Sequence, residues 1–259
     1  MGSWLRTAGV WLGLVVVFTT FYLLSGRQRE PQPLIAWLPY LLPLLFLDFF
    51  AFFFRRQRRA ASEAMAGVAQ LTRGSYSQAL ATFDRTMPRL PRSNALPFNR
   101  GLALLALWRV AEADQAFARA AALKGLGNAD LTLLLVPLRA LASALLGRTD
   151  AARAHLAEAD RLDPSPSPQH TLARLVLAAR TGAWEQVQAL SQRFELTQLG
   201  GVGRGLTDAL RAWTAEQLEG RRPALDATPL LGETGVAAVR ATWPELADFV
   251  ERATAPPGR

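Results

Sequence analysis

The sequence contains no cysteine, only two histidines and a single lysine, Lys124. The lack of cysteine excludes a disulfide framework, a thiolate metal site and a cysteine nucleophile. His155 and His170 have no second histidine or carboxylate at a ligand spacing, so we expect surface or packing roles and no metal site. No G-x-S-x-G motif is present, and Lys124 stands beside an expected loop. The sequence therefore predicts no enzyme, no catalytic residue, no cofactor and no small-molecule substrate.

Charged residues are scarce near the N-terminus. Residues 7–26 carry no charge, and as a helix they would be about 30 Å long, enough to cross the hydrocarbon core of a membrane. A polar loop follows, and residues 34–54 form a second apolar stretch whose two prolines are tolerable in a membrane helix. The sequence predicts a two-helix membrane anchor in residues 1–59, with spans at about 7–26 and 34–54, that is retained rather than cleaved as a signal peptide.

Arginines give the predicted orientation of this anchor. Five of them flank the outer ends of the two spans, and two lie in the connecting loop. The positive-inside rule then places both ends, and everything after residue 59, in the cytoplasm of a cell with an inner membrane. Residues 1–59 carry a net charge of +5 out of the total of +8, from seven arginines against Glu30 and Asp48. Basicity beside apolar spans favours membrane lipid as a partner over nucleic acid.

Asp48 lies inside the second predicted span, where a carboxylate is costly and suggests a function. It precedes Arg55 by seven residues, which is about 10 Å along a helix. Two interpretations stay open. The side chain can reach the membrane interface, or it can make a polar contact with a partner helix within the membrane.

After residue 59, small and bulky residues recur at a spacing of 34. Gly67, Ala79 and Phe83 return as Gly101, Ala113 and Phe117. We expect the small residues where two helices approach closely, and Phe83 and Phe117 to fill the space between the two helices of their repeats. The motif in the first unit reads Gly74-x-Tyr76-x-x-Ala79-x-x-x-Phe83 and closes at Pro91. It resembles the tetratricopeptide repeat (TPR), a helix–turn–helix unit of about 34 residues. The resemblance implies an α-solenoid that binds other proteins.

The pattern continues with decreasing regularity, and we predict about four repeats over residues 60–196. In the second repeat Trp108 stands where the first has Gly74, which makes the tight turn less clear. The third is displaced by five inserted residues, which we place within 124–128. The fourth keeps Gly182 but has Val187 and Ser191 where a small residue and an aromatic are usual.

Residues 197–259 do not follow the period. We expect a glycine-rich linker at 199–206, helices at 206–218 and 244–253, and a disordered tail. The glycines lack the preceding strand and following lysine of a phosphate-binding loop. A repeat array needs a cap on its last apolar face, and these helices can supply it. Alternatively they can lie in the groove of the array, beside Leu141 and Val176.

An apolar stripe on the predicted first helices is the candidate partner-binding groove. In the TPR family this side of the first helix lines the concave face, so the resemblance implies an apolar peptide or helix as partner. Core packing is the competing explanation of the stripe. The stripe consists of Val68, Leu71, Phe98, Leu102, Leu105, Leu141, Leu145, Leu172 and Val176.

The sequence as a whole predicts an all-α protein: an N-terminal transmembrane helical hairpin, a TPR-like α-solenoid and C-terminal capping helices. The expected function is a membrane-anchored scaffold or adaptor for protein–protein interaction at the cytoplasmic face. The alternative is an assembly factor or subunit of a membrane complex that acts through its transmembrane hairpin.

Overall fold

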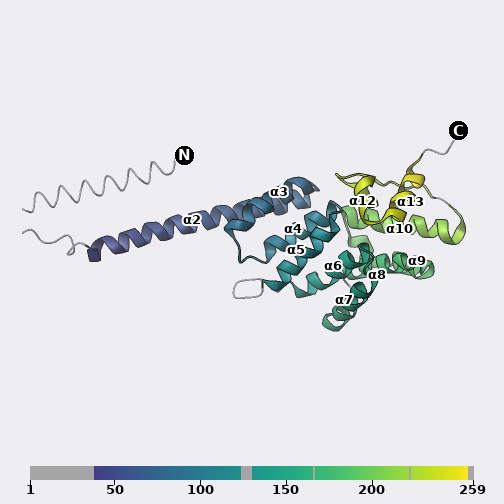
Figure 1. Ribbon diagram of the computed structural model, residues 1–259, viewed down its shortest axis with the longest axis horizontal. Helices are drawn as coiled ribbons and strands as arrows, with labels where there is room; N and C mark the ends of the chain where they lie inside the picture. Colours follow the sequence, from purple (N-terminus) through teal and green to yellow (C-terminus); the bar gives the residue numbers. More distant parts are fainter. Residues whose placement is uncertain (1–37, 124–129, 166, 222, 256–259) are drawn as a thin grey trace, which may run out of the picture. The chain divides into compact units, whose positions relative to one another are not determined.

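The computed structural model describes residues 38–123, 130–165, 167–221 and 223–255, and these consist of helices and connecting turns without a strand (Figure 1). The all-α prediction is therefore confirmed. The first predicted span, the predicted insertion at 124–128 and the tail from residue 256 lie outside the described residues.

The chain divides into two compact units, residues 1–56 and residues 57–259. Helix α2 (Leu38–Thr72) contains the described part of the first unit and continues into the second. Of the second predicted span, 34–54, the described part is helical from Leu38 onward. Within the described residues, no helix combines the length and the apolar character that crossing a membrane requires.

Pairs of helices joined by short turns make up most of the second unit. The end of α2 pairs with α3, and three further hairpins follow it within the described residues. The bounds are α3 (Tyr76–Thr86), the 3-10 turn η2 (Met87–Arg89), α4 (Ala95–Ala106), α5 (Val110–Ala122), α6 (Thr132–Leu145), α7 (Thr149–Leu162), α8 (Pro168–Arg180) and α9 (Trp184–Ser191).

The same turn joins the two helices of each of these hairpins. We call them turns 1 to 4. Each has one residue with left-handed backbone: Gly74, Trp108, Gly147 and Gly182, with φ of 81°, 57°, 71° and 71°. In each, the next residue donates its N–H to the carbonyl five residues earlier, as from Ser75 to Gln70 at 3.0 Å. This is the Schellman pattern that ends a helix. Trp108 thus occupies the turn position that glycine holds elsewhere.

Close helix approach in the first two hairpins depends on a glycine facing a phenylalanine. A Cβ at Gly67 would lie 2.7 Å from the Phe83 ring, and one at Gly101 would lie 2.4 Å from the Phe117 ring. Both phenylalanines are fully buried. The predicted role of these rings as filling between paired helices is confirmed.

The later hairpins keep the combined volume at this contact but divide it differently. Counted from their turns, the third has Ala140 and Leu156 at these two positions, and the fourth has Leu175 and Ser191. All four are buried. In the third hairpin the larger residue, Leu156, is still on the second helix, whereas in the fourth it has moved to the first, which explains why the fourth repeat departs from the motif in sequence.

Five short elements follow the last hairpin: the 3-10 turn η3 (Phe194–Gln198) and helices α10 (Gly201–Glu219), α11 (Thr228–Leu231), α12 (Val236–Thr242) and α13 (Pro244–Thr254). The predicted glycine-rich linker at 199–206 is wrong in most of its length, since α10 begins at Gly201. The reason is packing. A Cβ at Gly205 would lie 2.3 Å from the backbone nitrogen of Leu230, so this glycine allows α10 and α11 to touch.

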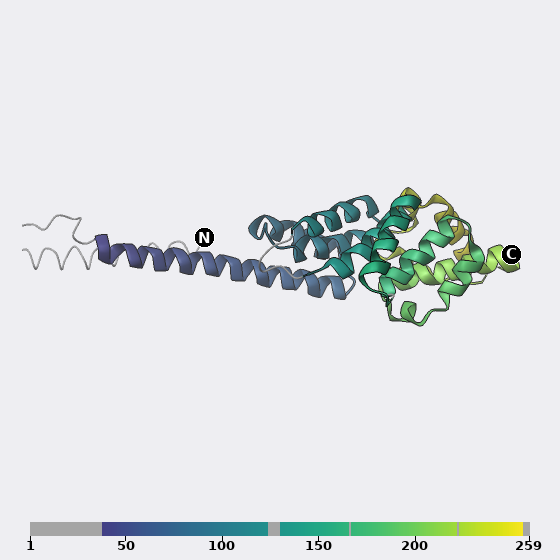
Figure 2. The ribbon, with the colours of Figure 1, turned by 90° about the horizontal axis from the view of Figure 1, so that it is seen from below.

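An aromatic cluster joins these helices to α9. The Trp213 ring lies 5.0 Å from Trp184, 5.9 Å from Trp243 and 5.6 Å from Phe249, between ring centroids. Leu206, Leu210 and Trp213 are buried in one core with Val187 of α9. In Figures 1 and 2 the C-terminal helices lie against α10. The apolar side of α9 is thereby covered.

Replacing Phe83 by alanine is expected to destabilise the protein by about 3–5 kcal/mol, because the ring is fully buried against Gly67. Urea unfolding of the purified chain measures the change. Phe194→Ala is the matched control, since that ring is 72% exposed and its loss should change stability by less than about 0.5 kcal/mol. Equal effects of the two substitutions would contradict the packing described here.

Candidate partner-binding groove

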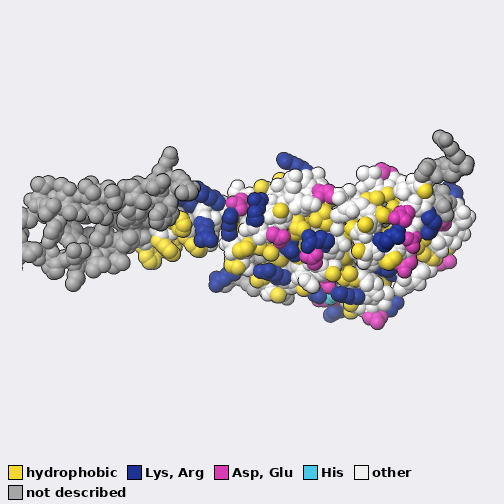
Figure 3. Space-filling view, turned by 45° about the horizontal axis from the view of Figure 1, so that its top comes forward, with side chains coloured by type: hydrophobic (Ala, Val, Ile, Leu, Met, Phe, Trp, Pro, Cys, Tyr) yellow, Lys and Arg dark blue, Asp and Glu magenta, His cyan; other side chains and the backbone are white. Residues whose placement is uncertain are grey.

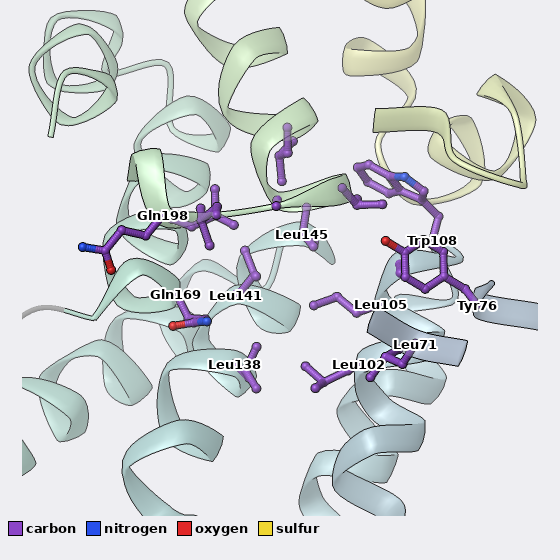
Figure 4. A pocket seen from close by; sticks show the side chains of 17 residues that line it. Leu71, Tyr76, Leu102, Leu105, Trp108, Leu138, Leu141, Leu145, Gln169 and Gln198 are labelled. Carbon is purple, nitrogen blue, oxygen red and sulfur yellow. The ribbon is translucent and has the colours of Figure 1, made fainter. Parts of the chain in front are cut away.

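A hollow of about 300 Å³ lies within the second unit, between the first helices of the hairpins and the η3–α10 segment (Figure 4). Helices α2, α4, α6 and α8 supply leucines to one side of it, and α10 closes the other side. The lining residues are Leu71, Tyr76, Leu102, Leu105, Ala106, Trp108, Leu138, Leu141, Leu145, Gln169, Leu172, Gln198, Leu199, Gly200, Val202, Gly203 and Leu206.

The chemistry of this cavity is apolar and neutral. No charged residue belongs to its described lining, and the polar groups are the amides of Gln169 and Gln198, the Tyr76 hydroxyl and the Trp108 indole. In Figure 4 the two glutamines lie at one end of the cavity, and Tyr76 and Trp108 lie at the other. Burial, and then the Glu233 carboxylate, raise the pKa of Tyr76, so its hydroxyl keeps its proton. Such a lining fits an uncharged apolar group and disfavours an ion.

Six of the nine residues predicted for the groove line this cavity: Leu71, Leu102, Leu105, Leu141, Leu145 and Leu172. The structure does not bring the other three into it. Val68 and Phe98 are partly buried against the core of the first two hairpins, and Val176 is fully buried in the core around α8. For these three positions, core packing explains the stripe.

One of the two dockings that the sequence left open for the C-terminal helices, into the groove beside Leu141, agrees with the cavity, since Leu206 of α10 lines it. Sequence reasoning missed Leu199 and Val202, which also line the cavity but belong to the segment interpreted as a linker. Their apolar spacing was a usable signal, but the intervening glycines hid it. The α10 segment lies in the groove without filling it, so the cavity remains beside it.

Asp48 and the two histidines are not among the described residues that line this cavity. Asp48 lies in α2, and its side chain is outside the described part. His170 is buried, with Nε2 3.3 Å from Asp160, and burial is the main cause that lowers the pKa of both His155 and His170. In the part of the chain that the structure describes, no three metal-ligating side chains gather.

No protein-family model, curated protein or solved structure matches this chain. The function therefore has to be argued from the cavity and from the elements that build it.

Two glycines of α10, two positions apart, are expected to respond oppositely to alanine. A Cβ at Gly203 would meet Leu199 and Leu172 at 3.6–3.7 Å, an ordinary contact, and alanine favours the helix, so Gly203→Ala should stabilise by about 0.5–1 kcal/mol. Gly205→Ala would force backbone apart and should destabilise by about 1–3 kcal/mol. Thermal unfolding of both variants checks the signs. Equal shifts would mean that α10 is not seated as described.

Proposed function

We propose that this protein is a membrane-anchored scaffold of the tetratricopeptide-repeat type, which holds an apolar segment of a partner protein in its groove at the cytoplasmic face of the inner membrane. The observation that carries the proposal is the preformed, uncharged cavity of about 300 Å³ on the inner side of the stacked hairpins.

The repeat character of the second unit supports a TPR-like scaffold. Its four described hairpins share one turn geometry, and their left-handed turn residues are 34, 39 and 35 positions apart. Stacked hairpins of this kind create extended concave surfaces that bind proteins. The lack of charge in the cavity distinguishes this groove from one that would hold a carboxylate.

The size of the cavity indicates how the partner binds. Ligand pockets span about 300–1,000 Å³, and this one lies at the lower end of that range. It suits one or two large aliphatic or aromatic side chains rather than a whole helix. A partner helix would thus lie over the groove and insert an apolar side chain into the cavity. A few buried residues of this kind carry most of the binding energy of an interface.

The described start of α2 supports the anchor. Six phenylalanines there are 43–65% exposed: Phe46, Phe49, Phe50, Phe52, Phe53 and Phe54. At 100° per residue they cover more than half of the circumference of the helix. Such a surface is unfavourable in water and favourable in a lipid bilayer. The exposed arginines at 55, 56, 58 and 59 follow directly, and Figure 3 shows hydrophobic and basic side chains side by side on this helix.

A photoreactive diazirine side chain in place of Leu105 tests the groove in intact membranes. We expect crosslinking to a partner protein through an apolar segment of its sequence, because Leu105 lines the cavity. Adding Gly203→Leu should fill the cavity and abolish that adduct. The matched control carries the diazirine at Phe194, which is exposed and lies outside the cavity lining. Equal labelling at 105 and 194, or labelling insensitive to Gly203→Leu, would contradict the proposal.

The crosslinked adduct at position 105 also distinguishes the scaffold from the second candidate function, an assembly factor that acts through its transmembrane hairpin. The exposed phenylalanines favour this second candidate, since they could contact a partner helix as well as lipid. Replacing residues 1–54 by an unrelated two-span anchor should leave the adduct at position 105 intact for a scaffold. Its loss would favour the hairpin as the binding element.

The arginine distribution predicts that residues 60–259 face the cytoplasm. Protease added outside intact spheroplasts should leave this part whole, and should digest it only after the membrane is broken. Cleavage in intact spheroplasts would place the groove on the opposite side.

A further inference from the structure

The C-terminal helices do more than cover α9, because one segment of them is hydrogen-bonded at turns 1 and 2 and is linked to turns 3 and 4 through Arg180 of α8. We call this segment, residues 227–254, the C-terminal clasp; it comprises α11, α12 and α13. At turn 1, the Glu233 carboxylate accepts hydrogen bonds from the N–H groups of Tyr76 at 2.7 Å and Ser77 at 3.1 Å. These bonds cap the start of α3. A hydrogen bond from the Ser77 side chain, and then these backbone bonds, lower the pKa of Glu233, so that it stays ionised.

At turn 2, the clasp holds the unusual residue Trp108 from two sides. The Trp108 indole Nε1–H donates to the carbonyl of Leu230 at 2.9 Å, and the Thr242 hydroxyl donates to the carbonyl of Trp108 at 3.3 Å. The ring itself is buried. The other three turns have glycine at this position, whose small size leaves no side chain for such a bond. The tryptophan is therefore placed where it can fasten the clasp.

At turns 3 and 4, Arg180 connects the clasp to two hairpins at once. Its Nη2 donates to the carbonyl of Leu145, just before turn 3, and to the carbonyl of Thr242 at 2.8 Å. Arg180 is also the last residue of α8, just before turn 4, and its guanidinium lies 4.2 Å from the centre of the Trp243 ring. Glu245 stands 3.7 Å from Nη1. The positive charge of Arg180 is thus paired with Glu245 and lies over the Trp243 ring at a half-buried position.

We propose that the C-terminal clasp fixes the spacing of the four turns and thereby holds the apolar cavity in its open shape before a partner binds. In an ordinary repeat array each repeat contacts only its neighbours, so the array can bend. Here one segment spans from turn 1 to turn 4. Two residues that it contacts, Tyr76 and Trp108, also line the cavity, and Arg180 links it to a third lining residue, Leu145. Only the link to binding rests on the proposed function.

Hydrogen exchange of the full-length protein tests the clasp with Glu233→Ala. Because a lost cap is worth roughly a fivefold change in an opening equilibrium, we expect roughly fivefold faster exchange. The increase should appear both at the start of α3 and in residues 228–242. Glu219→Ala, which removes another exposed, ion-paired carboxylate, is the control and should change neither region. Glu233→Gln keeps an acceptor oxygen and should show a smaller increase. Faster exchange confined to residues 76–79 would overturn the clasp and leave a local helix cap.

A double-mutant cycle that combines Glu233→Ala with Trp108→Phe supplies a second test. Glu233 bonds to turn 1, whereas Trp108 belongs to turn 2. If the clasp opens as one unit, Trp108→Phe alone should accelerate exchange at the start of α3 as well as in residues 228–242. The double variant should then show the product of the single effects, because both bonds are broken in the same opening step. Acceleration by Trp108→Phe that leaves residues 76–79 unchanged would mean independent contacts and would overturn the proposal. Phenylalanine keeps an aromatic ring at this buried position and lacks the indole N–H, so this variant is expected to fold.

The consequence for binding has its own measurement. Glu233→Ala changes no side chain of the cavity lining, yet it should reduce crosslinking from position 105 in proportion to the fraction of molecules in which exchange shows the clasp open, because only the closed shape is competent. Undiminished crosslinking in a variant whose clasp is open in half of the molecules would overturn the link to binding and leave the clasp standing. If the unmodified chain gives no adduct at all, the proposed function fails, and the exchange results still decide the clasp.

Discussion

The distance between the two helices of each hairpin is the constraint on which the rest of the second unit depends. In the first two hairpins a glycine must face a phenylalanine ring, since a single added carbon at Gly67 or Gly101 would lie within 3 Å of that ring. The hairpins stack because these contacts keep each pair equally close. In the fourth, Leu175 and Ser191 reverse the sizes at the same two positions. What is preserved is the volume between the helices, in agreement with the close packing of protein interiors.

Trp108 shows how the array and the C-terminal clasp depend on each other. A non-glycine residue in left-handed backbone costs about 1–3 kcal/mol and persists only where the surroundings fix it. Here burial of the ring, its hydrogen bond to Leu230 and the bond from Thr242 supply that support. Glycine at this turn would relieve the backbone and lose the buried ring and its bond to Leu230, while the carbonyl that accepts from Thr242 would remain. The strain at turn 2 is therefore understandable only together with residues 120 positions further along the chain.

What the sequence predicted correctly is mostly local. The pairing of Gly67 with Phe83 follows from spacing within one hairpin, and the apolar, helical character of residues 206–218 follows from their periodicity. The errors arose where a residue's role depends on a distant neighbour. Gly205 resembles a linker residue until the Leu230 backbone is placed against it. Periodicity also cannot separate cavity from core on a first helix, since Leu172 and Val176 share a face and only one of them lines the cavity.

The cavity exists partly because α10 has glycine, which has no side chain, at a position that faces it. Gly203 faces it from α10, and the nearest atoms to a Cβ there are 3.6 Å away, so a larger residue would fit. The hollow is partly open to solvent, so it does not carry the cost of an enclosed void. Two of its wall residues, Tyr76 and Trp108, are bonded by the clasp, and Arg180 links a third, Leu145, to it. Under the proposal, the shape of the hollow therefore depends on the same contacts that hold the clasp.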